Sequence, residues 1–304
     1  MELSLKEQII YYQLLEFNYQ ELVNFVMDYQ SQVGFDNRIT FAESYRIMRE
    51  HIVPQSKGSK NYALVTSHQW SNYQKWVHYL LPRSVMLHEP AYPTSWYHIY
   101  RPPVIVYYLG NGFRLGNKPI SIVGTRKITP YGQQMVDLIV QQLADKGYTT
   151  VSGLALGVDA AVHRASLNYQ AQTVAILPCG FHTIYPKQHH ALYQKIEQHG
   201  CLISEYLPWQ PPKKHHFILR NRLVAGLSPA TLVIEAAQRS GSLITANYAL
   251  QYNREVMVLP GRVTDSQSAG CNELIAAGAL PIISMTQLME ELALLYSTHQ
   301  HNNI

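Results

Sequence analysis

"TTVSGLALGVDAAVH", residues 149–163, joins a short β-branched run to a helical pattern through a glycine-containing turn. The first residues have the composition of a buried strand, and the residues after Gly157 have the apolar spacing of a helix. A strand that leads directly into a helix is the repeating unit of proteins with parallel sheets. The stretch therefore predicts the α/β class.

Short apolar and β-branched runs recur before and after this stretch, and segments with helical spacing separate them. Strands that alternate with helices favour right-handed βαβ units and a mainly parallel sheet covered on both faces. We therefore expect residues 119–304 to form one α/β domain. Its further strands are expected within 120–124, 173–180, 201–205, 231–236, 255–261 and 281–284.

The first part of the chain has a different pattern. Residues 1–82 mix polar and apolar positions at helical spacing, with a break at 54–61, "PQSKGSKN", and predict a small all-helical, SAM-like domain. Residues 83–118 are rich in Pro and Tyr and contain a Gly-Asn-Gly turn at 110–112. We expect them to form a connecting segment with one or two short strands, packed on the main domain.

The composition indicates a folded protein with a sizeable core, because 47% of its 304 residues are hydrophobic. The net charge is only +4, so a nucleic-acid role would need local clustering of cations. Cys179, Cys201 and Cys271 form no CxxC pair and are expected to pack in the core, as in a reducing cytoplasm. No apolar stretch approaches about 18 residues, and we expect a cytoplasmic protein without a membrane span.

Small residues follow the predicted strands, at the sheet edge where ligands of α/β proteins bind. Gly, Ser and Thr leave the N–H groups of the next helix free for an anion, so the preferred ligand is phosphate. Each turn taken alone is equally compatible with ordinary helix capping. Neither G-x-G-x-x-G nor a P-loop occurs, so no nucleotide cofactor and no ATP hydrolysis are expected. The turns are 124–127, 152–163, 179–187 and 235–246.

Basic residues cluster at the same strand ends, and no acid occurs between Glu205 and Glu235. Phosphate backbones bind such rims of cations. Phe217 lies among them, and an aromatic ring beside basic groups can stack on an unpaired base. The alternative is that Phe217 anchors its helix in the core. The cations are Arg126, Lys127, Lys187, Lys213, Lys214, Arg220, Arg222 and Arg239.

Two of these cations lie in one helical segment, "HHFILRNRLVAGLS", residues 215–228. Arg220 and Arg222 point about 200° apart on a helix and cannot share one face. We expect Arg220, which is nearer the start of the helix, to contact phosphate. Arg222 is then expected to pair with a strand-end acid, Glu205 or Glu235.

Asp159 and His163 are four residues apart and can meet on one turn of a helix. As an acid–base or metal pair they would indicate a hydrolase, but two ligands are a weak signal. We expect them to cap and pack their helix instead. The sequence thus predicts no catalytic residue and no metal site, and the protein is not expected to be an enzyme.

The motifs, in this order, closely resemble the DNA-processing protein A family, also called DprA or Smf. The resemblance covers about 120–283 and implies an extended Rossmann-like domain, often preceded by a small helical domain. It also implies a cytoplasmic, dimeric protein that binds and protects single-stranded DNA and loads the RecA recombinase in natural transformation. The matching segments include "SIVGTRKITPYG", "SGLALGVDAAVH", "FILRNRLVAGLS", "LVIEAAQRSGSLITA" and "GCNELIAAGA".

The resemblance also implies site residues. The arginine of the family's GTR motif matches Arg126, the basic residue three before the motif phenylalanine matches Lys214, and that phenylalanine matches Phe217. Leu156 stands where the family usually has Arg, so one possible phosphate contact is missing. The predicted DNA-binding set is Arg126, Lys127, Lys187, Lys214, Phe217, Arg220, Asn221, Arg222, Ser240, Gly241 and Thr245.

An alternative is an enzyme that cleaves nucleoside monophosphates, similar to the phosphoribohydrolase family once called lysine decarboxylase-like. That family has a P-G-G-x-G-T-x-x-E loop. The corresponding turn here, "EAAQRSGSLITA", lacks the double glycine and the downstream Glu. A pure protein scaffold is also disfavoured, because it would not need cations at successive strand ends.

Overall fold

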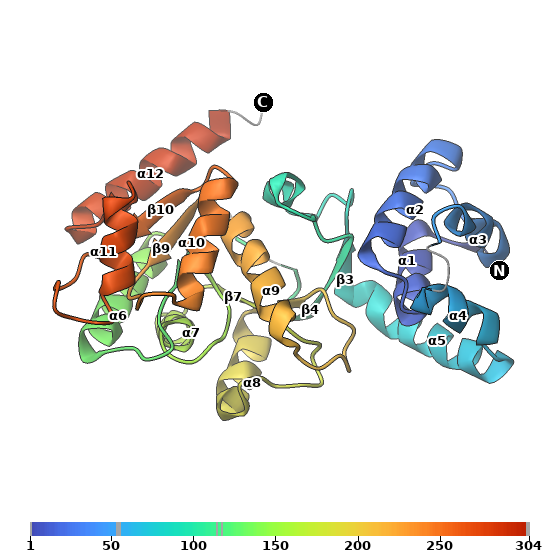
Figure 1. Cartoon of the computed structure of the whole chain (residues 1–304), viewed down its shortest axis with the longest axis horizontal. Helices are drawn as coiled ribbons and strands as arrows, with labels where there is room; N and C mark the ends of the chain where they lie inside the picture. The colour runs from blue at the N-terminus through green and yellow to red at the C-terminus, as the bar shows by residue number, and fades with distance from the viewer. Residues whose placement is uncertain (1, 53–55, 114, 117, 302–304) are drawn as a thin grey trace. The chain divides into compact units, whose positions relative to one another are not determined.

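The structure is a computed structural model that describes residues 2–52, 56–113, 115–116 and 118–301, and it divides into two compact units (Figure 1). The smaller unit comprises Met1–Tyr92 and Pro103–Tyr107, and the larger comprises Pro93–Pro102 and Tyr108–Ile304. None of the described helices is both long and apolar enough to cross a membrane.

The larger unit is built on parallel strands, as predicted. Each of the seven runs predicted to be strands overlaps an observed strand. Neighbouring strands from β5 to β11 pair in parallel. Together with β3 and β4, which pair antiparallel, these strands form one nine-stranded sheet. Its strand order is β11-β10-β9-β5-β6-β7-β8-β4-β3. The parallel strands are β5 Pro119–Val123, β6 Thr149–Ser152, β7 Thr173–Ile176, β8 Cys201–Ser204, β9 Ala230–Val233, β10 Glu255–Val258 and β11 Leu280–Pro281.

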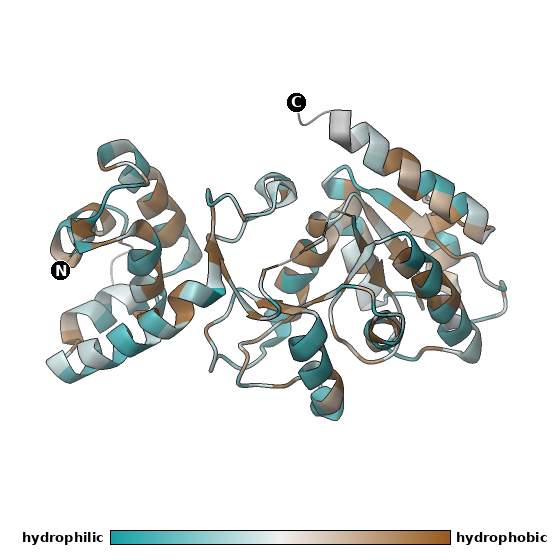
Figure 2. Cartoon of the chain, turned by 180° about the vertical axis from the view of Figure 1, so that it is seen from behind, coloured by the Kyte–Doolittle hydropathy of each residue, from teal (hydrophilic) through white to brown (hydrophobic). Residues whose placement is uncertain are grey.

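Helices cover both faces of this sheet. α6, α7 and α12 share a hydrophobic core with one face, and α9 and α10 lie against each other on the opposite face (Figure 1). The strands between them are buried and mostly apolar, with several buried Ser and Thr side chains among them, and brown segments mark the apolar residues in Figure 2. The helices are α6 Pro130–Asp145, α7 Val158–Asn168, α8 His190–His199, α9 Lys214–Leu227, α10 Gly241–Gln251, α11 Ala269–Ala276 and α12 Met285–His301.

The smaller unit is mainly helical. Its helices begin at side-chain caps such as Asn18 and Thr66, and aromatic rings such as Tyr12 and Phe25, which meet edge to face, fill its core. Two short strands, β1 (Glu2–Leu3) and β2 (Ile39–Thr40), pair antiparallel, so the unit is not all-helical as predicted. The helices are α1 Leu5–Leu14, α2 Tyr19–Gln32, α3 Phe41–Arg49, α4 Lys57–Leu64 and α5 Ser67–Leu80.

The predicted break at 54–61 is wrong for its second half. α4 begins at Lys57 because the Ser56 hydroxyl accepts a hydrogen bond from the Ser59 N–H and caps the helix. Residues 54 and 55 lie outside the described residues.

The connecting segment predicted at 83–118 is divided between the two units. β3 (Ser84–Met86) pairs with the first residues of β4 (Ile105–Gly110). β3 and residues 105–107 of β4 belong to the smaller unit, and residues 108–110 belong to the larger one. Between the two strands, the Trp96 indole donates a hydrogen bond to the Leu223 carbonyl of α9, 3.2 Å away, within the larger unit. The segment therefore packs only in part on the main domain. Its Gly-Asn-Gly turn is present, closed by a bond from the Gly112 N–H to the Gly110 carbonyl.

Candidate nucleic-acid interface

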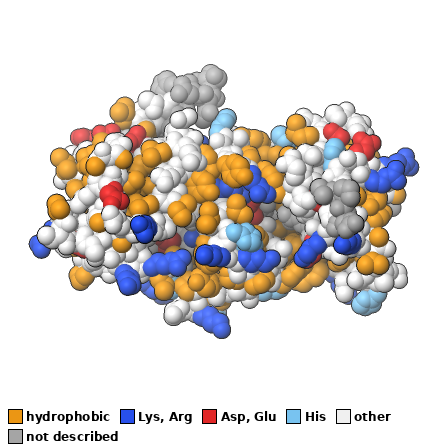
Figure 3. All heavy atoms as spheres, viewed as in Figure 1, with side chains coloured by type: hydrophobic (Ala, Val, Ile, Leu, Met, Phe, Trp, Pro, Cys, Tyr) orange, Lys and Arg blue, Asp and Glu red, His pale blue; other side chains and the backbone are white. Residues whose placement is uncertain are grey.

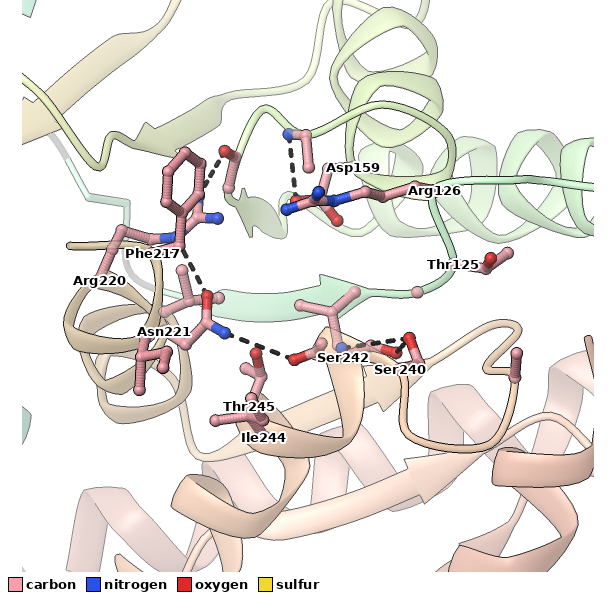
Figure 4. A pocket seen from close by; sticks show the side chains of 18 of the residues that line it. Thr125, Arg126, Asp159, Phe217, Arg220, Asn221, Ser240, Ser242, Ile244 and Thr245 are labelled. Carbon is pink, nitrogen blue, oxygen red and sulfur yellow. Dashed lines mark hydrogen bonds between the residues drawn. The ribbon is translucent and has the colours of Figure 1, made fainter. Parts of the chain in front are cut away.

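A cavity of about 540 Å³ lies at the carboxyl ends of β5 and β6, between α9 and α10. Figure 4 shows Arg126 and Asp159 on one side, Phe217 and Asn221 of α9 on a second, and Ser240, Ser242, Ile244 and Thr245 of α10 on a third. This is the edge at which the sequence predicted a ligand. Nine of the eleven predicted DNA-binding residues line this cavity: Arg126, Lys127, Lys214, Phe217, Arg220, Asn221, Ser240, Gly241 and Thr245.

The other two predicted residues do not line the cavity. Lys187 is exposed at the start of a 3₁₀ turn, Lys187–His189. Arg222 is buried and its Nη2 lies 2.6 Å from Oε1 of Glu205. The ion pair predicted for Arg222 is thus confirmed, and its place among the DNA-binding residues is corrected, because the helix turns its side chain away from the cavity.

Arg220 takes the opposite direction, as the helical geometry predicted. Its guanidinium Nη1 donates to the carbonyls of Gly153 and Ile176, the latter at 2.7 Å. Its Nε donates to Asn221 Oδ1 at 3.2 Å (Figure 4). A Cβ at Gly153 would collide with the guanidinium, so a larger residue there would displace Arg220 from this position. Arg220 therefore joins the ends of β6 and β7 while it also lines the cavity; its phosphate contact stays a prediction.

Glu235 is not the partner of either arginine. Its carboxylate accepts hydrogen bonds from the Thr129 N–H, at 3.0 Å, and from the Thr129 hydroxyl. Thr129 is the N-cap of α6. Glu235, which follows β9, thus holds the start of α6. It reaches Thr129 because β9 lies next to β5 in the sheet.

Asp159 and His163 are both buried in α7 and have different partners. Asp159 Oδ2 accepts from the Ala155 N–H at 3.3 Å, and burial raises the pKa of this carboxyl although nearby Arg220 opposes the shift. His163 Nδ1 lies 2.7 Å from Thr173 Oγ1, and burial lowers the pKa of this imidazole to about 3. The predicted packing role is confirmed, since both side chains are buried, whereas the predicted capping role is wrong, because the N-cap of α7 is Gly157 and no side chain caps the helix. The described part of the chain holds no cluster of three or more potential metal ligands.

Phe217 lies half-buried beside the cavity, with a cation and a second ring around it. The Arg126 guanidinium carbon is 6.0 Å from the centre of the Phe217 ring, and the Tyr185 ring meets it edge-on at 5.1 Å. Because part of the ring stays accessible, Phe217 is not simply a core anchor. A base that entered the cavity would meet an aromatic face and a cation together.

The first turn of α10 presents polar groups to the cavity. Ser240 is its N-cap and accepts a hydrogen bond from the Ser242 N–H at 3.4 Å. Asn221 Nδ2 donates to the Gly241 carbonyl at 3.4 Å and so connects α9 to this turn. Free N–H groups at the start of a helix favour an anion.

The sequence did not point to Ile218, Ile244 and Gln267, which also line the cavity. Ile218 and Ile244 are large apolar side chains that remain 43% and 36% exposed. Gln267 accepts a hydrogen bond from the Thr125 hydroxyl at 2.6 Å across 142 residues of sequence. The only local signal in the sequence for these three residues was an isoleucine on the polar face of an amphipathic helix pattern.

Charge gathers on the same side of the larger unit. Figure 3 shows a band of Lys and Arg side chains over the part where α7 and α9 lie in Figure 1, with few acidic groups among them. The exposed cations of the cavity rim include Arg126, Lys127 and Lys214. The rim predicted from the sequence is therefore present despite the small net charge.

Comparison with known proteins agrees with the fold. Residues 83–293 match the family described as DNA recombination-mediator protein A. The chain belongs to this family. It is 38% identical over 252 residues to Protein Smf of Synechocystis sp., covering 81% of this chain and 60% of that protein. It is also 38% identical to DNA processing protein DprA of Bacillus subtilis, over 69% of this chain and 71% of that protein.

Two solved DprA structures resemble the chain. The one from Streptococcus pneumoniae has a TM-score of 0.81 at 29% identity and covers 96% of this chain and 99% of that one. DNA processing protein A from Helicobacter pylori has a TM-score of 0.63 at 33% identity, over 69% of this chain and 95% of that one. The Helicobacter structure was described for the single-stranded DNA binding mode of that protein. The predicted DprA/Smf membership and α/β fold are confirmed.

Proposed function

We propose that this DprA relative binds single-stranded DNA in the cavity between α9 and α10. One observation carries the proposal: the Arg126 guanidinium and the half-buried Phe217 ring lie together on the wall of a cavity edged by further cations. Cations attract the phosphate backbone, and an accessible ring stacks on an unpaired base. The single-stranded DNA binding mode described for the Helicobacter relative supports single-stranded DNA as the ligand.

Unpaired bases are the expected ligand because the cavity is lined by α9, α10 and the turns after β5 and β6, with the Phe217 ring on its wall. A duplex hides its base faces in the stack, so it could offer only phosphates to the rim. Single strands should therefore bind more tightly than duplexes of equal length. Binding should also weaken steeply with salt, since several phosphates are neutralised together.

The test is fluorescence anisotropy with a labelled oligothymidine and its duplex, for the parent protein, Phe217→Ala and Phe217→Tyr. Phe217→Ala is expected to lose about 1–3 kcal/mol of binding, the contribution of one stacked base. Phe217→Tyr keeps a ring and should bind like the parent. Equal affinity for single and double strands, or an unchanged affinity of Phe217→Ala, would overturn the proposal.

We further propose that the protein is not an enzyme. The buried Asp159 and His163 have separate partners, and the cavity residues assemble no nucleophile and base. The alternative, a phosphoribohydrolase, would release free base from nucleoside monophosphates. Chromatography after incubation should find none, and release that disappears in Asp159→Asn would establish the enzyme instead.

The finer roles rest on family resemblance. We propose that the protein acts as a homodimer in the cytoplasm, protects incoming single-stranded DNA and loads the RecA recombinase onto it during transformation. Assembly of RecA on an oligonucleotide should proceed faster when the strand is first bound by this protein. An unchanged rate would contradict the loading role, and a monomer in sedimentation analysis would contradict the dimer.

A further inference from the structure

A second cavity lies beside the first one in the larger unit. It has a volume of about 680 Å³ and is formed by two segments: the start of α6, Thr129 to Tyr131, and the loop between β10 and α11, Pro260 to Ser268. This volume falls in the range of small-ligand sites, about 300–1,000 Å³. None of the predicted DNA-binding residues lines this cavity.

An aromatic ring and a cation line the second cavity. The Tyr131 side chain is 46% exposed, and Arg262 is exposed and pairs with no acid among the described residues. The nearby acids are already engaged: Glu235 accepts bonds from Thr129, and Asp265 accepts the Gln267 N–H at 2.9 Å. The lining of the second cavity thus holds an accessible ring and an exposed arginine, the same kinds of side chain that Phe217 and Arg126 contribute to the first cavity.

The two cavities share both of their connecting segments. After β5, Lys127 lines the first cavity and Thr129 lines the second; after β10, Gln267 lines the first and Ser268 the second. The hydrogen bond from Thr125 to Gln267 holds the two segments together. Consecutive Cα atoms are about 3.8 Å apart, and successive nucleotides of a stacked strand rise by about 3.4 Å. Lys127 and Thr129 are two residues apart and Gln267 and Ser268 are adjacent, so the two cavities adjoin along this edge.

We propose that the second cavity holds the next nucleotides of the strand bound in the first cavity, with a base stacked on Tyr131 and a phosphate at Arg262. This inference rests on the proposed single-strand binding and extends its path past Lys127 along the carboxyl edge of the sheet. A second site makes the affinity depend on the length of the strand, because a short strand occupies only the first cavity and a long strand occupies both.

The test compares labelled oligothymidines of about 4 and about 16 nucleotides, the range of site sizes known for single-strand binders. Tyr131→Ala should lower the affinity for the long strand by roughly 5- to 150-fold and leave the short strand unaffected. Tyr131→Phe keeps the ring and should match the parent. Arg262→Ala should reduce the salt slope for the long strand by about 1, whereas Arg164→Ala, which removes an exposed charge of α7 outside both cavities, should not.

Thermal unfolding of each variant checks that the fold is intact. If the parent binds neither oligonucleotide, the proposed function itself fails. If the parent binds both but Tyr131→Ala and Arg262→Ala bind the long strand like the parent, only the second site is refuted. A change in the sedimentation of Tyr131→Ala without a loss of long-strand affinity would also refute it and would assign this face to contacts between protein copies.

Discussion

Arg222→Met tests whether the second arginine of α9 serves stability and not DNA. The parent ion pair joins Arg222 Nη2 and Glu205 Oε1 at 2.6 Å, with 3% and 16% of the two side chains exposed. Removing one partner of a buried pair costs about 3–5 kcal/mol because the other charge is left without compensation. Since Glu205 keeps some contact with solvent, we expect a loss at the lower end, about 3 kcal/mol. For a unit of this size that lowers the melting temperature by roughly 6–12 °C.

Calorimetry and oligonucleotide binding should be measured on the same preparations. Arg222→Met combined with Glu205→Gln should recover most of the lost stability, because the amide leaves no buried charge. Arg164→Met removes an exposed arginine and should change the free energy of unfolding by less than about 0.5 kcal/mol. DNA affinity of Arg222→Met should equal that of the parent at a temperature where both are folded. A variant that melts like the parent, or one that folds normally and loses DNA binding, would refute this division of roles.

Three further predictions concern the first cavity and the thiols. Arg126→Ala should reduce the slope of log affinity against log salt by about 1, which a titration at several salt concentrations measures; an unchanged slope would exclude a phosphate contact. Burial raises the pKa of Asp159, so its contribution to stability is present at low pH and is lost as the pH rises through that pKa. Asp159→Asn should flatten this part of the curve of stability against pH, and identical curves would contradict the assignment. Burial raises the pKa of Cys179 to about 11 and of Cys271 to about 12, so a thiol reagent at neutral pH should modify them only after unfolding; rapid labelling of the native protein would show otherwise.

Local sequence determined the strands, most of the helices and the directions of the two arginines. Central parallel strands are buried on both faces, so they are short runs of apolar, β-branched and small residues without charges, and such runs are visible without any knowledge of partners. Helical periodicity likewise fixes the angle between Arg220 and Arg222 wherever the helix lies. The sequence could also place Arg126 and Phe217 near one edge, because parallel strands bring their carboxyl ends together.

Only the tertiary structure decided which groups meet. Glu205 and Glu235 both follow strands, but the pairing of β9 with β5 takes Glu235 to Thr129 and leaves Glu205 for Arg222. The contact between Thr125 and Gln267, and with it the border between the two cavities, joins residues 142 positions apart. Strand order and loop packing depend on the sum of many distant contacts, each too weak to leave a pattern at a single position. For that reason the chemistry of the edge could be predicted from the sequence, whereas its ion pairs and its second cavity could not.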